Sequence, residues 1–190
     1  MKNRKMWITI GVIVLVVLMI IAGYNHFVTL EQNINGKWSE VENQYQRQAD
    51  LIPNFVSSVS SQVGVETKFV KDVIAARTAW QSAQGQLAKD TAGVQMNNGV
   101  TALVSAVAEN YPTLQASEGY TALRDEMAGT QNRITTARGR YIESIQMYNT
   151  ATKRFPGNVL AGIFGFTQKD YYSAEAGSLE TPELGTGVLP

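Results

Sequence analysis

Side chains that could carry out acid–base or metal chemistry are few in this chain and poorly grouped. There is one histidine, His26, and no cysteine. A zinc site needs several nitrogen or sulfur ligands, and a di-iron bundle needs Glu-x-x-His motifs on two helices, which the sequence lacks. A Ser–His–acid group would have to be built around His26, which follows a long apolar segment. We therefore predict no catalytic residue, no metal site and no cofactor.

Paired carboxylates offer a second route to catalysis. They occur as Asp125-Glu126 and as Glu40 with Glu42. Residues one or two positions apart do not share a helix face, so these pairs are more typical of a solvated surface than of an acid–base site. We expect a protein that is not an enzyme. An enzyme that uses carboxylates and arginines inside a bundle is the third-ranked class, and it would need several buried carboxylates on facing helices.

The charge pattern argues against nucleic acid as a partner. The formal net charge is zero, and without the three basic residues at the N-terminus the chain is slightly acidic. Binding to nucleic acid depends on a basic face that neutralises phosphates. The arginines 133, 138 and 140 could bind an anionic partner, but they are more typical of an exposed helix face.

A membrane anchor is the clearest feature of the sequence. Residues 6–22 form a run of 17 without a charged side chain. At about 1.5 Å per residue, a helix from Trp7 to Tyr24 spans roughly 25 Å, close to the thickness of the hydrocarbon core. The two rings lie at the ends of this span, at the level of the lipid headgroups, which aromatic residues prefer. We predict a transmembrane helix over residues 6–24, preceded by a basic segment over residues 1–5 that contains Lys2, Arg4 and Lys5.

A cleaved secretory signal is the alternative interpretation of this run. Such signals end in small residues before the cleavage point, whereas Ile20-Ile21-Ala22 places a bulky residue there. We therefore favour an uncleaved anchor. The next basic residue is Lys37, so the positive-inside rule predicts a cytoplasmic N-terminus and an extracytoplasmic bundle.

The rest of the chain is patterned as helices. From Phe27 to Ile52, apolar residues recur at intervals of three, four or seven, which indicates an amphipathic helix that continues the anchor. Pro53 predicts a kink near Asp50, and Gly64 is a candidate C-terminal stop.

A second helix is expected from Glu66 or Thr67 to about Leu87. Its predicted buried face consists of Phe69, Val70, Val73, Ile74, Trp80 and Leu87. Residues 89–93 are interpreted as a loop, and the Asn97-Asn98-Gly99 sequence leaves the start of the third helix uncertain. The dipeptide Tyr111-Pro112 is expected to end that helix.

The fourth helix is predicted to begin after Ser117 as N-cap and to end at Pro156. Its apolar residues follow a seven-residue repeat: Tyr120, Leu123, Met127, Ile134, Tyr141, Ile145 and Tyr148. We predict an all-α fold, in which the transmembrane helix continues into an elongated antiparallel bundle over residues 25–155. The long seams of the first and fourth helices, with small residues such as Gly129, Ala137 and Gly139, could also pack against copies of the chain.

The C-terminal part divides into two segments. Residues 156–173 contain a strongly apolar group that forms a candidate contact surface: Val159, Leu160, Ile163, Phe164 and Phe166. This segment either folds back on the bundle or docks on the bilayer or a partner. Residues 174–190 are acidic and rich in Ser, Thr, Gly and Pro, which predicts a flexible tail.

Motifs spread over most of the exposed domain resemble the LemA family. They include residues 43–54 (NQYQRQADLIPN), residues 109–112 (ENYP), and the ending Phe155-Pro156-Gly157-Asn158 with Phe164-Gly165-Phe166. One departure is Arg47-Gln48, where the family usually has two arginines. The resemblance extends from about Gly23 to Tyr172. It implies a small prokaryotic membrane protein with a helical bundle and no established enzymatic activity, of a family that is often encoded near envelope proteins and sometimes within magnetosome gene sets.

Together these features predict a non-enzymatic, membrane-anchored scaffold of the prokaryotic cell envelope. The lipid bilayer is the first expected partner, a homo-oligomer is expected, and an envelope protein is a further possible partner. The alternative is an accessory subunit or adaptor for an envelope protease or transporter.

Overall fold

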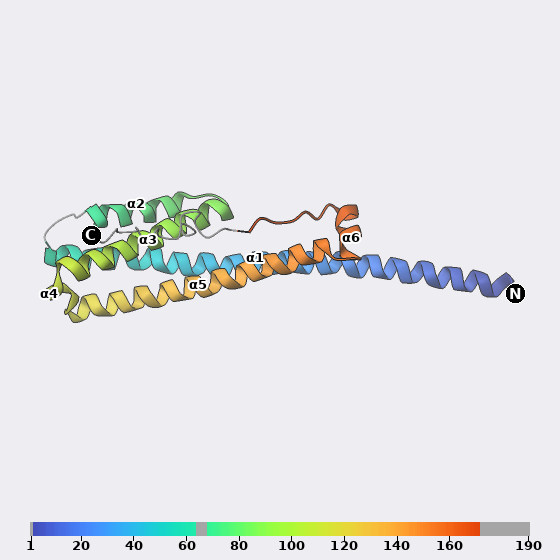
Figure 1. The fold of residues 1–190 in the computed structure, drawn as a ribbon, viewed down its shortest axis with the longest axis horizontal. Coiled ribbons are helices and arrows are strands. Elements are labelled where there is room, and N and C mark those ends of the chain that lie inside the picture. Colours follow the sequence, from blue (N-terminus) through green and yellow to red (C-terminus); the bar gives the residue numbers. More distant parts are fainter. Residues whose placement is uncertain (1, 64–67, 172–190) are drawn as a thin grey trace, which may run out of the picture.

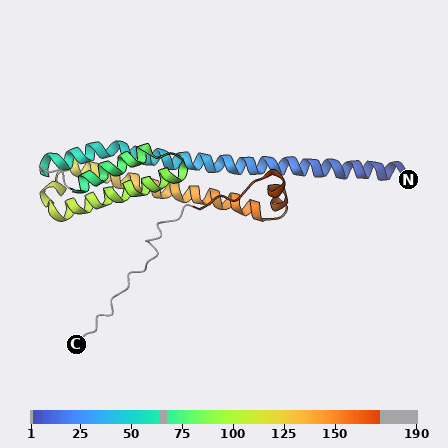
Figure 2. The same cartoon turned by 90° about the horizontal axis from the view of Figure 1, so that it is seen from above.

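A computed structural model describes residues 2–63 and 68–171 of the 190-residue chain. The elements are α1 (Lys2–Val63), α2 (Lys68–Ser82), α3 (Gln86–Asn110), α4 (Pro112–Gln115), α5 (Glu118–Lys153) and α6 (Gly157–Phe164). The described residues contain no strand, and the predicted all-α fold is confirmed. Figures 1 and 2 show an elongated rod in which the N-terminal part of α1 projects beyond all the other helices.

Helix α1 joins the apolar N-terminal segment to the bundle without a break. It contains 62 residues and continues through Pro53 to Val63, whereas the predicted stop at Gly64 lies outside the described residues. Its side chains from residue 3 to residue 19 are all exposed, and burial in the core begins only at Phe27. It is the one helix in the described part of the chain that is long and apolar enough to cross a membrane.

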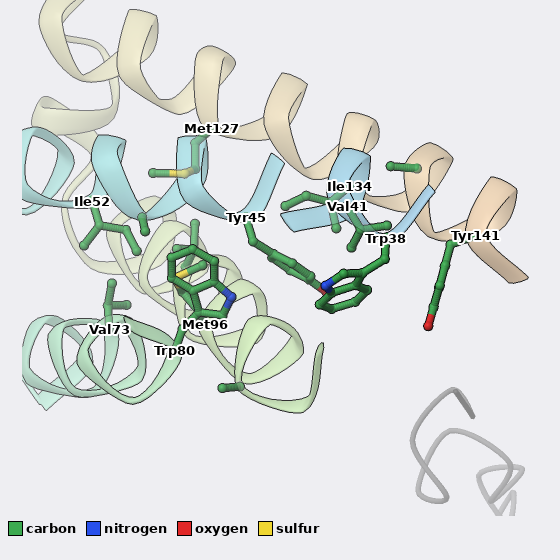
Figure 3. Close-up of a cluster of buried hydrophobic side chains, with 14 of the residues drawn as sticks. Trp38, Val41, Tyr45, Ile52, Val73, Trp80, Met96, Met127, Ile134 and Tyr141 are labelled. Carbon is green, nitrogen blue, oxygen red and sulfur yellow. The ribbon is translucent and has the colours of Figure 1, made fainter. Parts of the chain in front are cut away.

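The core lies mainly between α1 and α5. Three aromatic contacts mark the interface: Phe27 with Tyr148, Trp38 with Tyr141, and Phe55 with Tyr120. Residue numbers rise along α1 as they fall along α5, so the two helices are antiparallel. Apolar residues of α1 at helical spacing, among them Ile34, Val41, Tyr45 and Ile52, are buried in this interface and against α2 and α3. Figure 3 shows part of this core.

Helices α2 and α3 form a hairpin against the distal half of α1 and α5, and here several predictions were wrong. The second helix ends at Ser82, and Leu87 is 65% exposed in the first turn of α3. The chain turns at Gly85, whose φ of 82° is readily adopted only by glycine. Phe69 and Ile74, predicted to be buried, are also exposed.

The predicted loop at residues 89–93 is part of α3, which also includes Asn97, Asn98 and Gly99. Tertiary contacts explain this difference. A Cβ atom on Gly93 would lie 2.6 Å from Cζ of Tyr45, so the glycine permits α3 to approach α1 closely. Asp90 is buried and pairs with Arg138 of α5. Residue types that are common in loops are here used to make close helix contacts.

The ends of the next helices agree with the predictions. Helix α3 ends at Asn110, before Tyr111-Pro112, and Pro112 begins the short α4. Ser117 occupies the N-cap of α5, but its hydroxyl donates to the Leu114 carbonyl and makes no capping hydrogen bond. Six residues of the predicted repeat in α5 are buried and Leu123 is partly buried.

The chain reverses after α5. Helix α6 packs against α1 and α5, and the segment that follows returns along the bundle (Figure 1). Residues 172 and 173 of the predicted C-terminal segment, and the predicted tail over residues 174–190, lie outside the described residues.

Candidate membrane-contact site

The predicted anchor residues lie on the part of α1 that projects from the rod. Lys2 is the first helical residue, and Arg4 and Lys5 are exposed. The side chains of Trp7 and Tyr24 are also exposed. In a bilayer the apolar side chains between the two rings would face lipid. The exposure of this run is therefore what an anchor requires, whereas the core helix of a soluble protein would be buried.

Helix α6 contacts α1 at the end of the predicted span. A Cβ atom on Gly23 would clash with Cδ1 of Leu160, so the absence of a side chain there lets α6 approach α1 closely. Leu160 and Ala161 are the buried residues of α6, and Ile20 is partly buried against the same cluster. The last turns of the predicted span are thus covered on one side by α6.

An aromatic group fixes this junction. Tyr24 contacts Phe164 edge-on, with ring centroids 5.1 Å apart, and lies 5.8 Å from Phe166. Phe166 stacks on Phe27 at 4.9 Å, and Phe27 in turn contacts Tyr148 of α5. Because Phe166 follows Gly165, whose φ of 76° ends α6, the chain can turn Phe166 back into the core.

The segment after α6 is held to the bundle by polar contacts. The amide nitrogen of the Asn149 side chain donates to the Lys169 carbonyl at 2.7 Å, and the Lys169 backbone N–H donates to Oδ1 of Asn149 at 2.9 Å. The Lys169 ammonium also pairs with Glu31 of α1 at 2.7 Å and lies over the Tyr148 ring. Two helices therefore fix the path of the chain that returns from α6.

The five residues of the predicted contact surface are divided between two faces. Leu160 and Phe166 pack inward, and Phe164 touches Tyr24 but remains partly exposed. Val159 and Ile163, four residues apart on α6, are exposed, as is Phe155 just before the helix at 82%. The apolar segment therefore packs on its own bundle with one face and leaves the other face uncovered.

A cavity of about 360 Å³ lies between the end of the predicted span and the α5–α6 corner. Apolar side chains from both sides line it, including Met19 and Phe27 of α1 and Leu160 of α6. His26 and Arg154 supply polar lining groups. The described residues contain no group of three His, Asp or Glu side chains that could hold a metal ion.

A buried polar layer crosses the middle of the bundle. Oδ2 of Asp90 accepts from Nη2 of Arg138 at 3.0 Å, and the Tyr45 hydroxyl lies 3.5 Å from the other carboxylate oxygen. Burial raises the pKa of Asp90, and Arg138 partly opposes this shift. Burial also raises the pKa of Tyr45. Asp90 is the one buried carboxylate among the described residues, which is not the cluster that an acid–base site in a bundle would need.

The arginine group on α5 is occupied by contacts within the chain. Arg138 pairs with Asp90, Arg140 lies 3.8 Å from Glu40, and Arg133 contacts Glu126 at 3.2 Å. Arg47 joins the same Glu126 carboxylate at 2.6 Å, and hydrogen bonds from Arg47 lower the pKa of Glu126. These partners make the group a set of bundle contacts rather than a free anion site.

Sequence reasoning missed two basic residues at the junction. Lys153 ends α5 and Arg154 follows it, and both are exposed. They lie about 130 residues after the anchor in the sequence, so a search for basic residues next to the span could not find them. The available signal was the apolar segment that follows them in the sequence, because such a segment is expected to pack against the bundle or the membrane and would carry the two basic residues with it.

The fold and this junction define a class: membrane-associated proteins in which an N-terminal apolar helix continues into a helical bundle. The LemA family model matches residues 37–184, and the chain belongs to the LemA family.

Three magnetosome proteins are similar to this chain. Magnetosome proteins MamQ 1 and MamQ 2 of Paramagnetospirillum magneticum (strain AMB-1) are each 26% identical to this chain over an alignment of 217 residues. The alignment covers 99% of this chain and 79% of each relative. Magnetosome protein MamQ of Magnetospirillum gryphiswaldense (strain MSR-1) is 24% identical over 195 residues, covering 88% of this chain and 72% of the relative. Because the alignments with MamQ 1 and MamQ 2 include nearly the whole chain, the likeness extends to the apolar N-terminal part of α1.

Proposed function

We propose that this protein is a non-enzymatic scaffold, anchored in the cell membrane, whose helical rod projects from the bilayer and assembles with other copies of the chain. The observation that supports this most directly is the continuity of α1, from Lys2 to Val63. From Asn25 onward, 39 residues at about 1.5 Å each extend roughly 58 Å. A single helix would hold the far end of the bundle at that distance from the membrane.

The proposed topology has the N-terminus in the cytoplasm and the bundle outside. Lys2, Arg4 and Lys5 precede the span, while Glu31 is the first charged residue of the bundle side. The positive-inside rule favours this arrangement. A reporter that is active only in the cytoplasm, fused after Pro190, should be silent, and activity would reverse the topology.

The apolar residues of the α1 and α5 seams are packed against each other within one chain. Of the three small residues named from the sequence as possible contacts with a second copy, Ala137 is buried, Gly129 is partly buried and Gly139 is exposed. Contact between copies would therefore use outer surfaces, of which α2 is the strongest candidate because Phe69 and Ile74 are exposed on it. Anchored rods share one orientation, which raises the effective concentration for such lateral contact.

Self-assembly is tested on the full-length protein in mild detergent, by light scattering coupled to size exclusion and by lysine cross-linking. We expect oligomers, and fewer of them when Phe69 and Ile74 are both changed to Ser. Leu87→Ser is the matched control, because Leu87 is an exposed apolar residue on another helix. If the wild-type chain is monomeric throughout, the self-assembly part of the proposal is wrong.

An adaptor role for an envelope protease or transporter is the second candidate, and the same exposed residues of α2 favour it. Affinity purification of the full-length protein from membranes distinguishes the two. A stoichiometric partner, lost with the Phe69 and Ile74 changes, would favour the adaptor. Release of the intact protein by alkaline carbonate would overturn the anchor and with it both roles.

A further inference from the structure

The α5–α6 corner exposes an apolar surface at an unusual place, beside the end of the predicted membrane span. We define the corner face as Phe155, Val159 and Ile163. All three are exposed, and Phe155 and Ile163 have 82% and 66% of their surface accessible. Val159 and Ile163 are four residues apart on α6, the spacing that places helical side chains on one face, and Phe155 lies just before the helix.

Contacts to α1 fix the position of the corner face along that helix, and therefore its depth relative to the bilayer. Leu160 of α6 packs against Gly23, and Phe164 packs against Tyr24, which is the aromatic residue at the end of the predicted span. The adjoining cavity is lined by Met19, which lies within the span. Any surface at that level beside a transmembrane helix faces the boundary between lipid headgroups and acyl chains.

Two further features suit that boundary. Lys153 and Arg154 are exposed at the start of the corner and have no ion pair among the residues that the structure describes. Basic side chains near an apolar surface can reach lipid phosphates while their alkyl stems remain in the apolar layer. The cavity beside them is mostly apolar and opens next to the span, so a lipid acyl chain would fill it, with Arg154 and His26 at its polar side.

We propose that the α5–α6 corner is a second membrane-contact element that inserts into the leaflet on the bundle side. The corner face enters the headgroup–acyl boundary, and phospholipid fills the cavity against Met19 and Leu160. Because α6 is fixed to α1 at Gly23 and Tyr24, the corner and the anchor would hold the rod at two points and restrict its tilt. This inference rests on the proposed anchor, since it needs the span to be in the bilayer.

A single-cysteine label tests the insertion, because the natural chain has no cysteine. Full-length Ile163→Cys carries an environment-sensitive fluorophore and is reconstituted into vesicles of phosphatidylcholine and phosphatidylglycerol with or without lipids that carry a quencher near the headgroup. We expect a blue-shifted emission and a large loss of intensity with the quenching lipid. The Ile163 side chain is exposed, so labelling should leave the fold intact.

Leu87→Cys is the matched control, because Leu87 is 65% exposed but lies in the bundle, next to Gln86, which accepts a hydrogen bond from Tyr141. Its label should stay red-shifted and unquenched. Val14→Cys reports the anchor itself and should be quenched by lipids that carry the quencher deep in the acyl region.

The outcomes separate the two proposals. Quenching at position 14 without quenching at position 163 would overturn the inserted corner and leave the anchor in place. A blue-shifted label at position 163 that is not quenched by lipid but cross-links to a second copy would also overturn it, by showing that protein covers the face. Loss of quenching at both positions would contradict the anchor.

Discussion

The Asp90 carboxylate of α3 and the Arg138 guanidinium of α5 form an ion pair inside the bundle, with Oδ2 3.0 Å from Nη2. The Asp90 side chain is 8% exposed and that of Arg138 is 24% exposed. This pair ties the α2–α3 hairpin to the α1–α5 core. Such pairs often add more to the specificity of packing than to its strength, because removing two charges from water is costly.

The stability of the bundle should depend on pH through Asp90. Burial raises its pKa, so between the ordinary and the raised pKa the folded state holds a proton that the unfolded state releases. The contribution of Asp90 to the free energy of unfolding is therefore largest below its ordinary pKa and decreases as pH rises through this window.

The measurement compares the wild-type chain with Asp90→Asn in urea unfolding at a series of pH values. Glu40 and Glu126 have lowered pKa values and give slopes of the opposite sign, but they are present in both proteins and cancel in the difference. We expect the wild-type protein to lose stability relative to Asp90→Asn as pH rises through the window. A pH-independent difference would contradict the raised pKa.

Gly93 should not tolerate even one added carbon. An alanine Cβ would lie 2.6 to 2.7 Å from three ring carbons of Tyr45, a buried residue held by α1 and α3. We expect Gly93→Ala to lower the free energy of unfolding by about 1–3 kcal/mol, despite the better helix propensity of alanine. Gly99→Ala is the control on the same helix, because its Cβ would meet Val73 at an ordinary 3.5 Å. That variant should be neutral or stabilised by up to about 1 kcal/mol in the same denaturant titration.

Gly23 and Leu160 should be energetically coupled. Gly23→Ala places a methyl group against Leu160 and should push α6 away from α1, while Leu160→Ala leaves a gap in the same contact. The double variant should lose less stability than the two single variants together, by about 0.5–3 kcal/mol. The reason is that the methyl group added at position 23 fits into the gap left at position 160. Unfolding of the four proteins in detergent measures this coupling. Gly11→Ala, where the added Cβ meets nothing within 4 Å, should have no such coupling to Leu160→Ala.

Asn149 should control how often the returning segment opens. Asn149→Ala removes both hydrogen bonds to the Lys169 backbone, each worth about 1 kcal/mol. If opening limits access, trypsin cleavage after Lys169 should then become roughly tenfold faster or more, since about 1.4 kcal/mol corresponds to a factor of ten. Asn132→Ala changes an exposed residue of the same helix and should leave the cleavage rate unchanged. Equal rates in the two variants would mean that other contacts, such as the Lys169–Glu31 ion pair and the stacking of Phe166 on Phe27, hold the segment.

Much of the fold follows from local sequence signals. The uncharged run over residues 6–22 and the apolar spacing after Phe27 predict one long helix, and the helix is observed over Lys2–Val63. Ser117 as N-cap and Pro156 as the stop predict the limits of α5 to within a few residues, since the helix spans Glu118–Lys153. These features depend on hydrogen bonds and side-chain spacing within a few residues, so neighbouring residues are enough to specify them.

The hairpin and the corner could not be predicted in the same way. Residues 89–93 were interpreted as a loop because Gly and Asp are common there, yet in the bundle Gly93 admits the Tyr45 ring and Asp90 pairs with Arg138. The partners are about 48 residues apart in sequence, and no local pattern connects them. Likewise, the apolar segment after Pro156 was identified, but which of its faces would remain uncovered was not.

The sequence by itself determined that an apolar helix comes first, that helices follow it, and that chemistry-bearing side chains are sparse. Those properties are set by composition and by the period of the apolar residues. Only the tertiary structure decided that α6 returns to Gly23 and Tyr24, leaving Phe155, Val159 and Ile163 beside the end of the predicted span. The physical reason is that this placement depends on shape and aromatic contacts between residues more than 130 positions apart, which become neighbours only when α5 packs antiparallel to α1.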